Sequence, residues 1–169
     1  MSPNVAKSCA LALIPSIVTL LLVQACGGGS DAVAQSAAAS DADVIEGVWE
    51  STITIRDCTS GAAMRTFKGM NTFHRGGTLS DTNNQPTVNR GPGHGVWKKG
   101  VGSSYTASFR FYRYNPDGSL AGSQKVTRTT TLAADNNNTT GTISAQVLDT
   151  ADSVLQTLCG TETSVRIFQ

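Results

Sequence analysis

Polar and apolar residues alternate one for one along most of the chain after residue 46. The pattern is clearest in residues 49–56 (WESTITIR), 105–114, 125–132 and 142–148. A period of two places successive side chains on opposite faces of an extended strand, so each run predicts a strand with one buried and one wet face. No stretch of this part of the chain shows a convincing helical period. The chain is therefore predicted to be all-β.

Turn-forming residues separate the alternating runs. The strongest turn is Asn115–Gly118, where Pro116 presets φ and Gly118 accepts a left-handed conformation. Short turns join antiparallel neighbours, and a meander of strands removes its exposed edges by closing on itself. We therefore expect an antiparallel up-and-down barrel of about eight strands, with a β-sandwich as the alternative. The predicted strands lie near residues 47–57, 64–75, 77–81, 94–100, 103–114, 121–133, 140–149 and 153–168, with one long loop at 82–93.

The N-terminus resembles the export signal of a bacterial lipoprotein. Lys7 precedes an apolar stretch of 15 residues, Cys9 to Val23, which is shorter than the roughly 20 residues of a spanning helix. Residues 23–26 (VQAC) are similar to a lipobox, with an aliphatic residue at −3 and a small one at −1. The resemblance implies a helical signal peptide at residues 1–25 and lipidation of Cys26, which becomes the new N-terminus. The alternative is ordinary signal cleavage beside an incidental cysteine.

A linker and one domain follow the signal. Residues 27–43 are small and polar with no aromatic side chain, so residues 26–43 are predicted to be the lipidated cysteine and a flexible tether. Residues 44–169 are predicted to be the barrel domain. Without its signal the chain has 12 basic and 12 acidic side chains, and no basic stripe predicts nucleic-acid binding. The lipobox predicts a partner membrane and an extracytoplasmic location, at the outer membrane if the host has two, because Gly27 follows the cysteine.

Two of the four cysteines remain for the folded domain. Cys9 leaves with the signal and Cys26 is assigned to lipid, so Cys58 and Cys159 are left together in an oxidising compartment. A disulfide between them is the prediction, with two free thiols as the alternative. No metal is predicted, because two cysteines without a CxxC spacing and two distant histidines make a poor ligand set.

The two ends of the domain carry a motif that resembles the calycin superfamily of lipocalin-like barrels. Gly47-Val48-Trp49 opens the first strand, and Arg166 lies in the last. In that family a Gly-x-Trp tryptophan closes one end of the barrel, and a cation from the last strand stacks on it. The resemblance implies that Gly47, Trp49 and Arg166 close this barrel. The Thr-Asp-Tyr signature of lipocalins and their following helix are absent from this sequence, so the resemblance concerns architecture rather than ligand class.

One cation shares the predicted inward face. Arg128 has the parity of Val126 and Leu132. It would serve as a counter-ion for an anionic ligand, or form an internal ion pair, or lie outside after a register shift. The interior faces are short of large residues, which leaves room for a ligand. The predicted cavity residues are Ile53, Ile55, Phe109, Phe111, Arg128 and Leu132.

Other motifs predict little chemistry. His74 and His94 are the only histidines, and either could act as a base or ligate a haem. Residues 91–95 (GPGHG) imitate a phosphate loop, but the residues that follow predict a strand rather than the required helix. Ser80, Asp81 and His74 are triad residue types without a nucleophile elbow. No catalytic residues and no cofactor are predicted.

Three functions fit this sequence. The first is an envelope-anchored barrel that binds a small apolar or amphipathic ligand. The second is a structural or interaction protein of the envelope with a filled barrel. The third is a barrel enzyme of the cyclase or isomerase kind, for which an inward histidine beside a carboxylate would be the sign.

Overall fold

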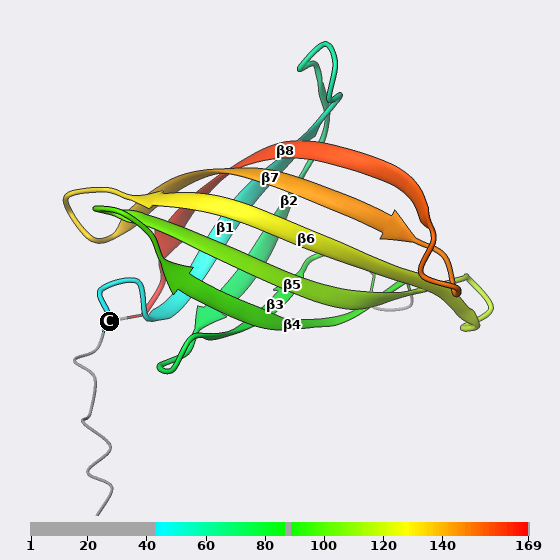
Figure 1. The fold of residues 1–169 in the computed structure, drawn as a ribbon, viewed down its shortest axis with the longest axis horizontal. Helices are drawn as coiled ribbons and strands as arrows, with labels where there is room; N and C mark the ends of the chain where they lie inside the picture. Colours follow the sequence, from blue (N-terminus) through cyan, green and yellow to red (C-terminus); the bar gives the residue numbers. More distant parts are fainter. Residues whose placement is uncertain (1–42, 87–88, 169) are drawn as a thin grey trace, which may run out of the picture. The chain divides into compact units, whose positions relative to one another are not determined.

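The strands of the folded domain form one closed ring (Figure 1). The structure is a computed structural model that describes residues 43–86 and 89–168. Each strand pairs antiparallel with the next, and the last pairs with the first. The strands are β1 (Gly47–Arg56), β2 (Ala63–Phe73), β3 (Thr78–Asn83), β4 (Arg90–Lys99), β5 (Ser104–Tyr114), β6 (Leu120–Leu132), β7 (Asn138–Leu148) and β8 (Val154–Arg166). The predicted all-β, eight-stranded up-and-down barrel is confirmed, and the sandwich alternative is wrong.

The predicted signal peptide, Cys26 and residues 27–42 of the predicted tether lie outside the described residues. Among the residues described, no helix combines the length and the apolar character that crossing a membrane would require.

The alternation of side chains along each strand gives the barrel wall an inner and an outer face. Along β1, Trp49, Ser51, Ile53 and Ile55 are buried inside the barrel, while the residues between them are half-exposed. The outer face is rich in threonine, and Thr52 and Thr54 of β1 lie opposite Thr163 and Thr161 of β8. Branched side chains suit this pleated, half-buried surface, which explains why a sequence poor in leucine still forms long strands.

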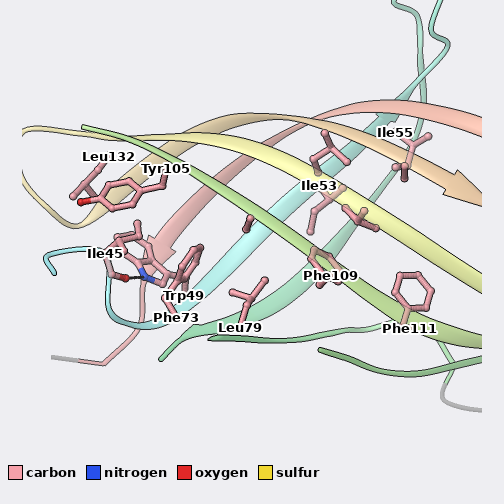
Figure 2. Packing of buried hydrophobic residues seen from close by; sticks show 14 residues of the cluster. Ile45, Trp49, Ile53, Ile55, Phe73, Leu79, Tyr105, Phe109, Phe111 and Leu132 are labelled. Atoms are coloured by element: carbon pink, nitrogen blue, oxygen red, sulfur yellow. Dashed lines mark hydrogen bonds between the residues drawn. The ribbon is translucent and has the colours of Figure 1, made fainter. Parts of the chain in front are cut away.

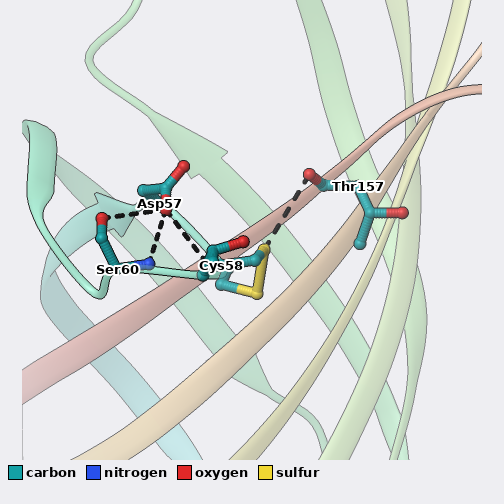
Figure 3. Close-up of a disulfide and its surroundings, with 6 residues drawn as sticks. Asp57, Cys58, Ser60 and Thr157 are labelled. Atoms are coloured by element: carbon teal, nitrogen blue, oxygen red, sulfur yellow. Dashed lines mark hydrogen bonds between the residues drawn. A yellow bond between two sulfur atoms is a disulfide. The ribbon is translucent and has the colours of Figure 1, made fainter.

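The seam between β1 and β8 closes the ring. Its register runs from Trp49 opposite Arg166 to Arg56 opposite Cys159. Just beyond the seam a disulfide joins Cys58 to Cys159, with 5.1 Å between the two Cα atoms, so the predicted bond is confirmed (Figure 3). The adjacent turn is ordered by Asp57, whose carboxylate accepts hydrogen bonds from Ser60.

One end of the barrel is filled by large apolar side chains (Figure 2). Trp49 is 1% exposed, and its indole N–H donates to the Ile45 carbonyl at 2.9 Å. The Arg166 guanidinium lies over the indole ring, 4.3 Å from its centroid, and donates to the Glu46 carbonyl. Gly47 has a φ of +128°, and a Cβ there would lie 2.6 Å from Arg166 Nη1. Glycine is therefore needed at this position both for its backbone conformation and for the approach of the cation.

The chain enters the barrel at this closed end. Asp43, the last residue of the predicted tether, accepts a hydrogen bond from the Tyr105 hydroxyl and pairs with Lys99 at 3.2 Å. Burial raises the pKa of Asp43, but the hydrogen bonds from Tyr105 and Lys99 outweigh it, and the pKa is lowered overall. The pKa of Tyr105 is raised by burial and by the Asp43 carboxylate. The folded closed end of the barrel therefore includes Asp43.

Part of the predicted long loop is strand. Residues 90–93 belong to β4, with a register shift between Arg90 and Gly93. Gly93, and Gly95 just after this segment, allow close packing rather than a turn. A Cβ at Gly93 would lie 3.0 Å from Phe109 Cδ2, and a Cβ at Gly95 would lie 2.0 Å from the Ser108 carbonyl oxygen. The connection from β3 to β4 is correspondingly short.

Candidate functional site

A pocket of about 660 Å³ occupies the open end of the barrel. The connections β1–β2, β3–β4, β5–β6 and β7–β8 surround this end, opposite the end where Trp49 lies. The β5–β6 and β7–β8 turns lie together there, and the β1–β2 hairpin projects beyond the wall (Figure 1). We call this pocket the mouth. Its lining residues are Ile55, Met64, Arg65, Gln85, Asn89, Arg90, Phe111, Arg113, Tyr114, Pro116, Gln124, Val147, Gln156 and Leu158.

The mouth combines an apolar wall with positive charge. Ile55, Phe111 and Val147 are buried, and Leu158 is half-buried. Three arginines and four neutral amides supply the polar groups, and the lining includes no aspartate or glutamate. A concave apolar surface with a few convergent polar groups is the usual form of a small-molecule site, and the volume lies within the usual range of about 300–1,000 Å³.

A network of four charged side chains fills the barrel below the mouth. Asp81 of β3 bridges two arginines, Arg90 of β4 and Arg128 of β6, the second at 3.1 Å. Arg128 also contacts Glu162 of β8 at 3.2 Å, and the Thr130 hydroxyl donates to Glu162 at 2.8 Å. All four charged side chains are at most 5% exposed. Burial raises the pKa of Asp81, against the opposing effect of its two arginines.

Aromatic rings complete the surroundings of the two arginines. The Arg90 guanidinium lies 3.9 Å from the centroid of the Phe111 ring, and that of Arg128 lies 4.8 Å from the centroid of Phe109. Stacking of this kind favours the planar guanidinium over a lysine ammonium. The cations are therefore held by carboxylates on one side and rings on the other.

This network leaves little free space in the middle of the barrel. The cavity among its side chains measures about 40 Å³. The network forms the floor of the mouth, because Arg90 borders both spaces. A ligand in the mouth would therefore rest on a polar floor rather than enter a deep apolar channel.

The six residues of the predicted cavity are distributed along the barrel. Ile55 and Phe111 line the mouth, whereas Ile53, Phe109 and Arg128 border the small inner cavity. Leu132 lies beyond both, beside Tyr105 near the closed end. Of the readings left open for Arg128, the structure shows the internal ion pair.

The two histidines lie outside the barrel. His74 and His94 are exposed, and His74 Nε2 lies 2.9 Å from the Ser80 hydroxyl. Asp81, the residue after Ser80, points inward to its arginines, so the strand's alternation separates Asp81 from His74 and Ser80. Within residues 43–86 and 89–168, no group of three His, Cys, Asp or Glu side chains could hold a metal ion.

Sequence reasoning missed most of the charged residues at this end. Arg65 shares the inward parity of Phe67, and Arg113 continues that of Phe109 and Phe111, so alternation could have identified both. Asp81 lies in a short strand whose pattern alone does not reveal its partners.

The fold and site together define a small β-barrel with one plugged end and one open end whose pocket is lined by three arginines. Searches against protein-family models, curated proteins and solved structures found no match for this chain.

Proposed function

We propose that this protein is an extracytoplasmic lipoprotein whose calycin-like barrel binds a small amphipathic ligand in its mouth. The observation that carries the proposal is the difference between the two ends of the barrel. One end is plugged by Trp49 and Arg166, and at the other a pocket of about 660 Å³ reaches the buried side chains of Ile55, Phe111 and Val147. A barrel that served only as a spacer would gain nothing from an open pocket that leads to its interior.

Two observations support the location. A disulfide between Cys58 and Cys159 suits an oxidising compartment, and the sequence before it resembles a lipoprotein signal. The chain enters the barrel at the closed end, beside Tyr105. The first described residue, Asp43, is therefore at the end opposite the mouth.

The calycin resemblance is supported by the arrangement at the closed end. Trp49 faces Arg166 across the β1–β8 seam, and the guanidinium stacks on the indole. Gly47 has no side chain that would collide with the Arg166 guanidinium. These are the three roles that the motif implies.

Lipidation is tested by comparing two cysteine variants of the full chain. Cys26→Ala should abolish the diacylglycerol mass increment and shift the protein out of the membrane fraction. Cys9→Ala, the matched control within the apolar stretch, should leave both unchanged. Unaltered mass and fractionation of Cys26→Ala would refute the anchor.

Ligand binding is tested by blocking the mouth. Gln156 points into the mouth, and Gln146 of the adjacent strand is exposed on the outer wall. We expect the full chain purified in a non-ionic amphipol to retain a small molecule detectable by solvent extraction and mass spectrometry. Gln156→Trp should abolish its retention and Gln146→Trp should not. Equal recovery from both variants would refute binding in the mouth.

A filled, structural barrel is the competing function. The charged network and the inner cavity of only about 40 Å³ favour it, because the barrel middle has no room for a ligand. Under this alternative the wild-type extract is empty and no member of a lipid panel raises the melting temperature.

A further inference from the structure

Charge inside the barrel is balanced only in its middle. The described inward-facing carboxylates there are Asp81 and Glu162, and they are matched by Arg90 and Arg128. Two further arginines, Arg65 and Arg113, line the mouth. Neither forms an ion pair with a described residue, so the lining of the mouth holds two arginines without a paired carboxylate.

Arg113 is the more constrained of these two. It is half-buried, and its Nη1 atom is buried without a hydrogen-bond partner among the described residues. It lies directly opposite Arg90 in the β4–β5 register. Like charges in cross-strand positions repel, and a buried donor without a partner is costly. An anion beside Arg113 would relieve both.

The nearby carboxylates are already engaged. On the turns around the mouth, Asp57, Asp117 and Asp149 accept hydrogen bonds within their own turns, and Asp152 pairs with Arg110. Thr87 and Val88, which the structure does not describe, have no charged side chain. Among the residues that the structure describes, none is therefore an evident counter-ion for Arg113.

Arg65 lies across the same opening. It is exposed, and its guanidinium is 5.5 Å from the centroid of the Phe67 ring. Its partner in the β1–β2 register is Ile55, which belongs to the apolar wall. An anionic group near the rim could thus meet Arg65 while an alkyl chain contacts Ile55 and Phe111.

From this charge distribution we propose that the mouth recognises the anionic group of an amphiphile, a carboxylate or a phosphate monoester, through Arg113 and Arg65. This inference rests on the proposed function, because it names the chemical class of the ligand in the same pocket. Arginine forks bind both anions with paired hydrogen bonds. Arg90 is paired with Asp81 and forms part of the floor of the mouth.

The test is calorimetric titration of the full chain in non-ionic amphipol with four probes of equal chain length. These are decanoate, decyl phosphate, decanol and decyltrimethylammonium, each corrected for empty amphipol. At least one anionic probe should bind about tenfold or more tightly than decanol, and its affinity should fall with added salt. Preference for decanoate or for decyl phosphate identifies which anion is recognised.

Charge removal tests the two named residues. Arg113→Gln should weaken binding of the anionic probe about tenfold and leave decanol binding unchanged, with a smaller effect for Arg65→Gln. Lys125→Gln, which removes a charge from the exposed face of β6, should change neither. Thermal unfolding of each variant checks that the barrel is intact.

The outcomes separate the two proposals. If decanol and the anionic probes bind alike and Arg113→Gln has no effect, the mouth binds amphiphiles and the anion inference is wrong. If no probe binds to the wild-type protein, both proposals fail. If the cationic probe binds best, the anion inference is also wrong.

Discussion

Removing Arg128 should leave the buried negative charge of Glu162 without a cation. Arg128 is the only arginine that contacts Glu162 among the described residues, and the Glu162 side chain is 1% exposed. Asp81, by contrast, would keep Arg90. Arg128→Met preserves most of the side-chain volume, so its main effect is to leave Glu162 with only the Thr130 hydroxyl as a partner.

The expected cost of Arg128→Met is about 3–5 kcal/mol in the free energy of unfolding, the range for breaking a buried pair from one side. That is a large part of the 5–15 kcal/mol typical of a domain. Adding Glu162→Gln should recover about 2 kcal/mol or more, because the amide needs no counter-ion and can still accept from Thr130.

Urea unfolding at pH 7 with the disulfide intact measures these differences, provided that the slope with urea is unchanged. Lys125→Met, on the outer face of the same strand, is the control and should stay within about 0.5 kcal/mol of wild type. A loss below about 1 kcal/mol for Arg128→Met would refute the reasoning, because it would mean that water reaches Glu162. A double variant no more stable than Arg128→Met alone would also refute it.

Three further predictions concern the ends of the barrel. Trp49→Ala should destabilise the protein by about 3–5 kcal/mol in urea unfolding, because the indole is 1% exposed and fills the closed end; a loss below about 1 kcal/mol would contradict the plug. Replacing Cys58 and Cys159 with serine should cost up to about 4.7 kcal/mol, the chain-entropy figure for a loop of about 100 residues, since the separation is 101 residues; equal melting temperatures of the variant and the oxidised protein would refute this. The lowered pKa of Asp43 contributes stability that is present above the ordinary pKa of about 3.9 and is lost as the pH falls through the lower folded value. The stability difference between wild type and Asp43→Asn should therefore shrink in acid, and a constant difference from pH 7 to pH 2 would contradict it.

Local alternation was enough to predict the strands and their faces. The side-chain period of a strand is two whatever its neighbours are, so Ile53 and Phe109 could be assigned to the interior from the sequence alone, whereas Arg128 shared their parity but kept an outward position as an alternative. The disulfide followed from counting cysteines. The Gly47, Trp49 and Arg166 motif gave the identity of the residues at the closed end.

The glycine-rich residues 90–93 form strand, although the sequence predicted a loop there. A glycine-rich segment predicts a turn when only local conformation is considered. In the folded barrel Gly93 and Gly95 lie against Phe109 of β5. A Cβ at Gly93 would lie 3.0 Å from this phenylalanine, and a Cβ at Gly95 would lie 2.5 Å from it. This close approach depends on a strand that follows later in the chain, so the sequence pattern could not distinguish it from a turn.

The sequence by itself determined that this chain forms strands with alternating inward- and outward-facing side chains, joined by short turns. It also determined that one pair of cysteines is available for a disulfide. Only the tertiary structure decided that Arg128 meets Asp81 and Glu162, that the barrel middle is filled, and that the unpaired arginines gather at the open end. The reason is register: alternation gives each residue a face, but which residues share a level inside the barrel depends on how strands distant in sequence align when the ring closes.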